Sequence, residues 1–263
     1  MLGIGAIHHH RLEPRGGEAP AGIAREGGAG GTPGWTAGCA GGTPRGAAMT
    51  GPHGRAAAEA TAFERLVFFS DAVFAIAITV LVLELRVPEL PPERAEAELL
   101  AHLLELWPRF FAYLISFVVI GLYWIGHHRL FRHIVRYDAG LLVLNLLLLL
   151  SVAFLPFPTA LISAYEYTRV AVVFYTLSLL ACVLLLWLLW WYASRGRRLV
   201  DPGLDPRTMR YLTLRTLSPL LAYLPTLAVA FVQPRAAAEL LLLILVIALV
   251  NTLVLDQRYL ARA

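Results

Sequence analysis

The sequence predicts an all-α polytopic membrane protein with six transmembrane helices per subunit. Hydrophobic residues make up 58% of the chain and its mean hydropathy is +0.66, too apolar for a water-soluble domain that must cover its surface with polar groups. Six apolar segments of about 20 residues or slightly more match the length that crosses about 30 Å of hydrocarbon. They lack the alternating pattern of a membrane β-barrel, so each is expected to be a helix.

The first 57 residues differ sharply from the rest. They hold most of the 21 glycines and almost no long apolar run, and such a segment cannot bury enough apolar surface to offset its ordering entropy. We interpret 1–57 as a disordered Gly-rich leader, or as an over-extended gene start with Met49 as the true start. The leader lacks the apolar core of a signal peptide. Residues 58–263 are expected to form the six-helix transmembrane domain.

Prolines and turn residues separate the apolar segments. Pro88, Pro91 and Pro92 end the first segment, and Asp201-Pro202-Gly203 lies between the fourth and the fifth, because proline removes the backbone donor that a continuing helix needs. The six helices are expected at 66–86, 107–127, 139–161, 167–193, 211–233 and 236–256.

The charges of the connections predict the orientation in the membrane. The chain has no lysine, and arginines gather in the connections after the second and fourth segments: Arg129, Arg132, Arg136, Arg195, Arg197, Arg198, Arg207 and Arg210. Because arginines concentrate on the cytoplasmic side, these connections belong inside and the acidic connection after the first segment belongs outside. We expect a multi-pass protein of the cell membrane with both termini cytoplasmic. The arginines form no continuous stripe, so the expected partner is the lipid bilayer and not nucleic acid.

Charged and polar residues stand where the first apolar segment begins, in Arg65-Leu66-Val67-Phe68-Phe69-Ser70-Asp71. A charge near hydrocarbon is expensive unless it faces protein or water, so such groups indicate a functional site. Arg65 and Asp71 are separated by about 9 Å of helical rise, too far for a direct pair. Their partners are therefore expected elsewhere in the bundle.

The predicted orientation brings Trp124-Ile125-Gly126-His127-His128 and Asn145 to the membrane face at which the first segment starts. A histidine and the Trp124 N–H could hydrogen-bond Ser70 and Asp71. Two other interpretations stay open: a histidine pair facing water, and Trp124 as an anchor in the interfacial aromatic belt.

Three residues further along the first segment share one face. At about 100° per residue, with Asp71 at zero, Ile76, Thr79 and Leu83 lie near 140°, 80° and 120°. Copies of this helix around an axis would form two apolar rings that exclude water and one ring of hydroxyl oxygens. The same spacing also fits packing against a neighbouring helix, which is its commoner cause.

The sequence carries no familiar catalytic or metal-binding pattern. HExxH, GxSxG, Walker and CxxC motifs are absent, so we expect neither an enzyme nor a bound cofactor. Adjacent His127 and His128 point about 100° apart on a helix, so they cannot approach one metal ion together. A disulfide between Cys39 and Cys182 is not expected. The filter sequence Thr-Val-Gly-Tyr-Gly is also absent, so any ion selectivity must come from side chains.

Taken together, these motifs resemble the transmembrane protein 175 family of potassium channels, found in lysosomes and in bacteria. The resemblance covers about residues 60 to 160 and rests on the Arg-x-x-x-Phe-Ser-Asp signature, the stretch from Ala72 to Thr79, the Trp124-x-x-His127-His128 element, Asn145 and Phe154-Leu155-Pro156-Phe157. It implies a homotetramer in which the first helix of each subunit lines a central pore permeable to K⁺. A second copy of the signature, as in two-repeat animal members, is missing, so four chains are implied.

The resemblance also assigns residue roles. It places pore constrictions at Ile76 and Leu83 and the potassium preference at Thr79. It implies a network that braces the first helix, made of Arg65, Phe69, Ser70, Asp71, Trp124, His127, His128 and Asn145. The alternative function is a secondary transporter with a proton or ion relay through Asp71, His127 and Asn145, although such proteins usually contain internal repeats.

Overall fold

The computed structural model describes the backbone of residues 52–260 and the side chains of residues 58–254. Six of the described helices are long and apolar enough to cross a membrane, which confirms the predicted fold class. They are α1 (Pro52–Val80) with its 3-10 extension η2 (Leu81–Glu84), α3 (Trp107–Phe131), α4 (Ala139–Phe154) continued by α5 (Pro156–Ala164), α6 (Arg169–Ser194), α7 (Pro206–Val232) and α8 (Pro234–Leu260). The predicted leader lies outside the described residues except for 52–57, which are helical.

The third span is divided at a single residue. α4 ends at Phe154 and α5 starts at Pro156, with Leu155 between them. Pro156 and Pro158 have no N–H, so neither can donate the hydrogen bond that would continue α4. The side chains of Leu155, Pro156 and Pro158 are nevertheless buried. The break is therefore packed inside the protein, where irregular backbone is tolerated at membrane depth.

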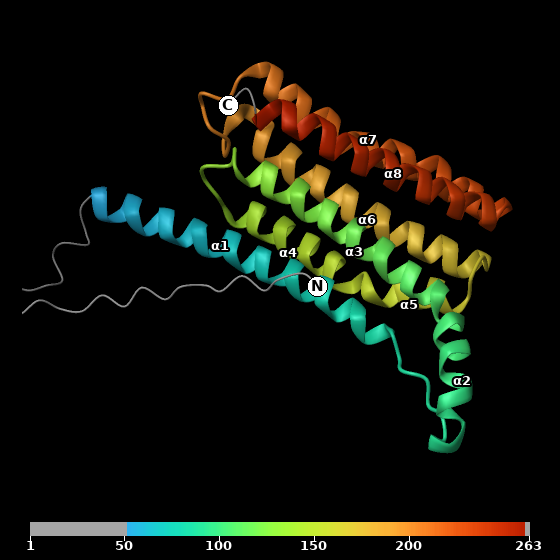
Figure 1. Cartoon of the computed structure of the whole chain (residues 1–263). Coiled ribbons are helices and arrows are strands. Elements are labelled where there is room, and N and C mark those ends of the chain that lie inside the picture. Colours follow the sequence, from blue (N-terminus) through green and yellow to red (C-terminus); the bar gives the residue numbers. More distant parts are fainter. Residues whose placement is uncertain (1–51, 261–263) are drawn as a thin grey trace, which may run out of the picture. The chain divides into compact units, whose positions relative to one another are not determined.

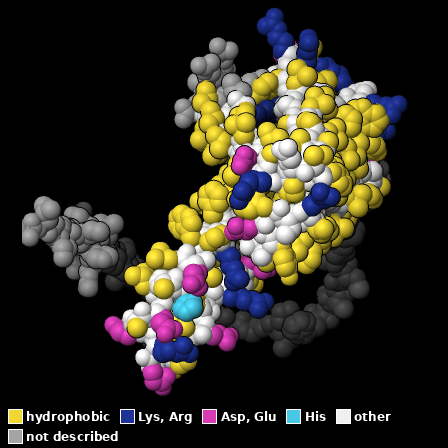
Figure 2. Space-filling model, turned by 90° about the vertical axis from the view of Figure 1, so that its right-hand side faces the viewer, with side chains coloured by type: hydrophobic (Ala, Val, Ile, Leu, Met, Phe, Trp, Pro, Cys, Tyr) yellow, Lys and Arg dark blue, Asp and Glu magenta, His cyan; other side chains and the backbone are white. Residues whose placement is uncertain are grey.

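The acidic connection after α1 contains a helix that the sequence interpretation did not identify. α2 (Pro92–Glu105) begins with a proline at its first position, a favourable place for proline. It buries no residue, and an Arg94–Glu98 ion pair of 3.8 Å lies on its surface. Figure 2 shows charged side chains gathered over this segment, whereas hydrophobic side chains cover much of the adjoining bundle. α2 is thus a polar helix attached to the apolar spans.

The spans are arranged around α6. α6 packs against α4, α5, α7 and α8, while α1 packs against α3 and α4. Figure 1 shows α1 on one side of the bundle and the α7–α8 pair on the other. Much of the core is aliphatic, with Leu81, Ile120, Leu148 and Leu189 fully buried. α1 is therefore a peripheral helix, held along one of its faces only.

Two of the predicted cytoplasmic connections meet at one end of the bundle. The segment after α3 and the segment after α6 join in an antiparallel bridge between Ile134 and Val200, and Asp201 N donates to His133 O at 3.0 Å. These are the arginine-rich connections, so the prediction that they lie on one side is confirmed.

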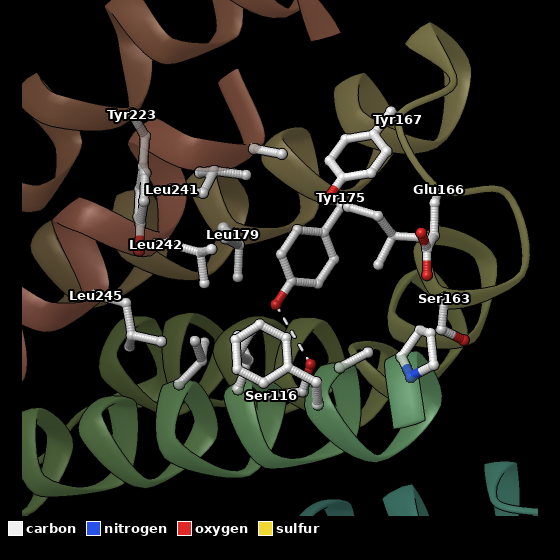
Figure 3. A pocket seen from close by; sticks show the side chains of 17 residues that line it. Ser116, Ser163, Glu166, Tyr167, Tyr175, Leu179, Tyr223, Leu241, Leu242 and Leu245 are labelled. Atoms are coloured by element: carbon white, nitrogen blue, oxygen red, sulfur yellow. Dashed lines mark hydrogen bonds between the residues drawn. The ribbon is translucent and has the colours of Figure 1, made fainter. Parts of the chain in front are cut away.

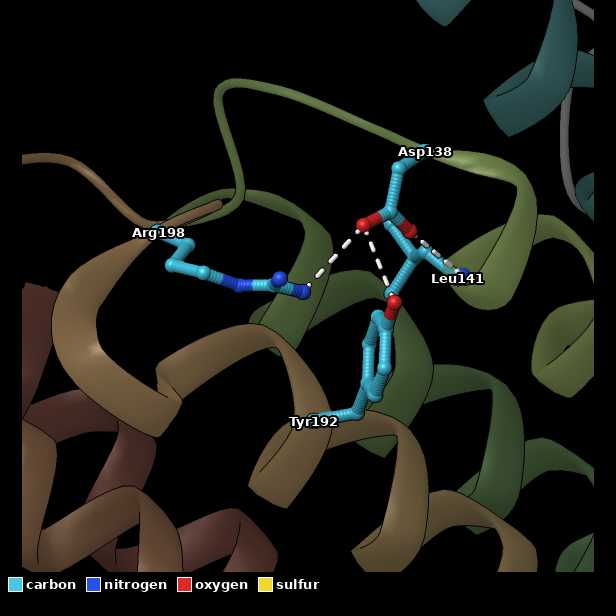
Figure 4. A network of polar contacts seen from close by, with 4 residues as sticks. All are labelled: Asp138, Leu141, Tyr192 and Arg198. Atoms are coloured by element: carbon cyan, nitrogen blue, oxygen red, sulfur yellow. Dashed lines mark hydrogen bonds and ion pairs between the residues drawn. The ribbon is translucent and has the colours of Figure 1, made fainter.

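Asp138 ties the same end together, as Figure 4 shows. Its side chain caps α4 by accepting from Leu141 N at 2.9 Å, and it also accepts from the Tyr192 hydroxyl at 2.9 Å and from Arg198 at 3.2 Å. Gly140 is required here because a Cβ at that position would collide with the Tyr192 ring. One carboxylate thus links the start of α4 to the end of α6.

Candidate functional site

α1 has one packed face and one open face. Ser70, Phe74, Ala77 and Leu81 are buried, and their spacing of three or four residues places them on a single stripe of the helix. This stripe faces α3 and α4, the helices against which α1 packs. The residues on this stripe are therefore covered by the bundle, and the residues on the opposite side of α1 are not.

The predicted Ile76, Thr79 and Leu83 stripe lies on the open face. Ile76 is 61% exposed and Leu83 is 71% exposed, and Thr79 is exposed as well. None of the three packs into the core of this chain, so packing against another helix of the same chain does not explain their spacing. Thr79 Oγ1 donates to Ile76 O at 2.9 Å, which leaves its lone pairs free to accept or coordinate.

A buried chain of hydrogen bonds connects α3, α4 and α1. His127 Nε2 lies 2.9 Å from Asn145 Oδ1, Asn145 Nδ2 donates to Ser70 Oγ at 2.9 Å, and Ser70 Oγ donates to Leu66 O at 2.9 Å. His127, Asn145 and Ser70 are fully buried. Because the amide of Asn145 turns its N–H₂ toward Ser70, its oxygen accepts from His127 and assigns the proton to Nε2.

Aromatic rings enclose His127. Its ring stacks on Phe131 at a centroid distance of 4.1 Å and lies 5.4 Å from Phe74. Nδ1 of this histidine has no hydrogen-bond partner among the described residues. The surroundings are therefore apolar except on the side of Asn145, which aims the imidazole at that one partner.

Asp71, the next residue along α1, has a different partner. Trp124 Nε1 donates to Asp71 Oδ1 at 2.8 Å, which joins α3 to α1 at the surface of the subunit. His128 is exposed and contacts this site only through the Trp124 ring, at a centroid distance of 5.7 Å. Of the two adjacent histidines, only His127 enters the buried network.

Two residues of the predicted network stand apart from it within one subunit. Arg65 is exposed and makes no hydrogen bond or ion pair among the described residues, and Phe69 is 51% exposed. The structure therefore brings together Ser70, Asp71, Trp124, His127 and Asn145, and it leaves Arg65 and Phe69 on the open side of α1.

A second buried polar cluster escaped the sequence interpretation. Ser116 on α3 lies 2.8 Å from the Thr159 hydroxyl on α5 and 3.3 Å from the Tyr175 hydroxyl on α6. These residues lie in and beside a cavity of about 140 Å³ whose outer part includes Glu166 and Tyr167 (Figure 3). Isolated hydroxyls inside apolar runs were the only signal, and such residues often bond only to their own helix.

A metal site is not formed by the side chains that the structure describes, because no three His, Cys, Asp or Glu groups come together there. The chemistry available at α1 is instead that of apolar side chains, hydroxyl oxygens and backbone carbonyls. These groups can exclude water or replace part of the hydration shell of a cation.

Comparisons with known proteins point to one family. A family model described as "Endosomal/lysosomal potassium channel TMEM175" matches residues 65–156. A potassium channel of Streptomyces collinus is 39% identical over 174 residues, covering 64% of this chain and 82% of that protein. The human endosomal/lysosomal proton channel TMEM175 is 40% identical over 98 residues, which cover 35% of this chain and 19% of the human protein.

A solved structure extends the match to the fold. The crystal structure of a lysosomal potassium-selective channel TMEM175 homolog from Chamaesiphon minutus superimposes with a TM-score of 0.64 at 33% identity. The alignment covers 73% of this chain and 98% of that chain. The likeness therefore includes helices beyond the residues that the family model matches.

Proposed function

This chain belongs to the TMEM175 family, a family of ion channels and not of enzymes, and from that premise we propose that it is a potassium-permeable cation channel. Cations would move passively through a central pore lined by α1. The observation that carries the proposal is the exposed stripe of Ile76, Thr79 and Leu83 on a helix whose other face is packed.

Four copies of the chain would form the pore. One helix per subunit can surround a conduction path only by repetition around an axis. α1 supports this because it lies at the edge of the bundle and turns an apolar face outward. The sequence contains a single Arg-x-x-x-Phe-Ser-Asp signature, which favours a homotetramer of four chains.

The three stripe residues would have different functions in the pore, with Ile76 and Leu83 forming the gate and Thr79 the selective layer. Rings of Ile76 and Leu83 would form apolar constrictions that gate by dewetting. The ring of Thr79 hydroxyl oxygens between them would replace part of the hydration shell of K⁺ and supply its preference over Na⁺. Thr79 Oγ1 donates its proton to Ile76 O, so the oxygen lone pairs remain available to a cation.

The polar contacts of α1 would hold the pore in shape without touching the ion. Ser70 is bound by α4 and Asp71 by α3, so neither side chain is directed at the open stripe. Arg65 and Phe69 on the open side would complete the bracing by contacting neighbouring subunits, and His128 would support the Trp124 ring. The network would thus set the rotation of α1.

The site of action would be the cell membrane, with both termini in the cytoplasm. The connections that meet at the Ile134–Val200 bridge carry clustered arginines, and arginine favours the cytoplasmic side. α2 and its glutamates would then lie outside.

The geometry offers less support to a secondary transporter. Such a protein would need Asp71, His127 and Asn145 in one relay, but Asp71 is bound to Trp124. The buried chain from His127 runs through Asn145 and Ser70 to the Leu66 carbonyl. A carbonyl has no proton to pass on, so that chain ends inside α1.

The test is ion flux in liposomes that contain the purified protein. A potassium gradient alone should drive K⁺ flux, and a subunit count in detergent should give four. Flux that requires an opposing ion gradient would favour the transporter. Flux of protons without K⁺ would instead indicate a proton channel, as the human relative is named, and would refute the potassium proposal.

A further inference from the structure

A cavity of about 280 Å³ lies between α3, α6, α7 and α8, away from α1. Its walls are mainly aliphatic and include Leu122, Leu186 and Ile244. Its polar lining is concentrated where α3 ends and includes Arg129, Arg215, Thr216, Asn251 and Thr252. The cavity is therefore amphipathic, with an apolar body and a positively charged end.

Arg215 places a positive charge in the lining of this cavity. It stands nine residues after Pro206, the first residue of α7, so it lies about 14 Å along the helix. Its guanidinium donates to the Thr252 hydroxyl on α8 at 2.7 Å. A hydroxyl is neutral, so this contact orients the arginine without balancing its charge. A charge at that depth of a membrane span is expensive and marks a functional site by default.

Arg129 adds a second positive charge from the opposite wall. It lies in the last turn of α3 and lines the same cavity. No described residue that lines the cavity is acidic. Two arginines that share one cavity raise its positive potential, and arginine forms bidentate hydrogen bonds with phosphate oxygens.

The cavity of about 140 Å³ beside Ser116 and Tyr175 touches some of the same helices but has a lining of different charge. It touches α3 near Pro108 and α8 near Ala238, whereas the arginine cavity touches them near Arg129 and Thr252. Among the described residues that line it, Glu166 alone is charged, and Figure 3 shows it at the edge of the cavity. Both cavities therefore have mainly apolar walls, and only the cavity that contains Arg129 and Arg215 has a positively charged lining.

We propose that the cavity between α3, α6, α7 and α8 binds an anionic phospholipid from the surrounding membrane. The phosphate lies between Arg215 and Arg129 and accepts from their guanidinium groups. One acyl chain lies along the aliphatic wall toward Tyr223. A lipid satisfies both requirements of the cavity, because its headgroup is negative and its chain is apolar. Basic pockets between transmembrane helices are suited to such headgroups.

The geometry also favours a lipid from one leaflet. The charged end of the cavity lies where α3 finishes, and α3 leads directly into the arginine-rich connection bridged at Ile134 and Val200. The headgroup region of the leaflet on that side is within reach of both arginines. A zwitterionic lipid, whose headgroup carries no net charge, gains less from them.

The test is native mass spectrometry of the purified full chain in detergent, titrated with phosphatidylglycerol, with phosphatidylcholine or with inorganic phosphate. The parent should bind phosphatidylglycerol more tightly than phosphatidylcholine, and less tightly as salt is raised. Arg215→Gln should weaken phosphatidylglycerol binding about fivefold, the effect of one arginine near a membrane surface. Arg210→Gln, an exposed arginine on the same helix outside the cavity, should leave it within about twofold.

A second variant separates lipid binding from a folding defect. Ala248→Phe fills the aliphatic part of the cavity and keeps both arginines, so it should reduce the number of bound phosphatidylglycerol molecules without lowering the thermal stability. Equal binding of the two lipids would overturn the proposal. So would equal effects of the two arginine variants, or inorganic phosphate displacing the lipid at the same concentration, which would indicate a plain anion site.

Discussion

Trp124 on α3 donates its indole N–H to a carboxylate oxygen of Asp71 on α1 at 2.8 Å. The preceding residue of α1, Ser70, accepts from Asn145 on α4 at 2.9 Å. Adjacent residues project about 100° apart on a helix, so two bonds to two different helices prevent α1 from rotating about its axis. They thereby determine which side chains occupy the open face of α1, including Ile76, five residues after Asp71.

We expect the Asp71–Trp124 contact to contribute to assembly. Asp71→Ala and Trp124→Phe should each lower the melting temperature of the purified protein, by an amount equivalent to about 1.5–3 kcal/mol for a hydrogen bond to a charged group. The melting temperature of the double variant should be little lower than that of either single variant, because each substitution removes the same hydrogen bond. A well-assembled Asp71→Ala tetramer with altered ion preference would instead assign Asp71 to the conduction path.

The buried amide of Asn145 should contribute more to the stability of the protein than the hydroxyl of Ser151, which lies on the same helix. Asn145→Ala removes the partner of His127 and the donor to Ser70, so it should destabilise the protein by about 1–3 kcal/mol. Ser151→Ala is the control, since Ser151 donates only to Leu147 O within α4. Chemical or thermal unfolding of both variants tests this. Equal effects would show that the buried chain does not hold α1.

Ile76→Ser should raise potassium conduction several-fold. A polar side chain in an apolar ring allows water to enter the constriction and removes the dewetting barrier. Leu150→Ser is the control because Leu150 is 67% exposed, close to the 61% of Ile76, but lies on α4. Liposome flux or single-channel recording measures the effect. If both variants conduct like the parent, Ile76 does not line the gate.

Thr79→Ala should reduce the preference for K⁺ over Na⁺. The change removes the hydroxyl oxygens that would coordinate the ion, whereas Thr79→Ser keeps them and should retain the preference. Reversal potentials with K⁺ on one side and Na⁺ on the other measure the ratio. An unchanged ratio in Thr79→Ala would move the selectivity to another layer.

Asp138 should make the bundle sensitive to acid at the end where α4 starts. The hydrogen bond from Leu141 N, followed by those from Tyr192 and by the charge of Arg198, lowers the pKa of Asp138 below its ordinary value. A lowered folded-state pKa means that this stabilisation is fully present above the unfolded pKa of about 3.9, and it is lost as the pH falls from there through the lower folded-state pKa. Melting temperatures at falling pH should decline less in Asp138→Asn than in the parent. A parallel decline would assign the acid sensitivity to other carboxylates.

Much of the fold follows from local patterns in the sequence. The six spans and the shared side of the two arginine-rich connections were predicted from apolar length and charge, and the structure confirms them. The end of the first helix was predicted less well: α1 ends at Val80 and η2 at Glu84, before the first of the prolines, Pro88. The same patterns placed Trp124, His127 and Asn145 near Ser70 and Asp71. Proline and hydropathy act over a few residues, so one chain suffices to identify them.

The partners within that group could not be assigned from the sequence. Pattern arguments allowed either histidine to bind Ser70 or Asp71, but the structure buries His127 against Asn145 and leaves His128 exposed beside Trp124. A rotation of α3 by about 100° would exchange the two. That rotation is set by the packing of the whole helix, which no local signal encodes.

By itself, therefore, the amino-acid sequence determined the membrane class, the number of spans, the residues near the entrance of α1 and the helical stripe of Ile76, Thr79 and Leu83. Only the tertiary structure decided that this stripe is the open face of α1 and that Arg129 and Arg215 share one cavity. These depend on contacts between residues far apart in the chain, and such contacts are settled by the packing of complementary surfaces rather than by periodicity.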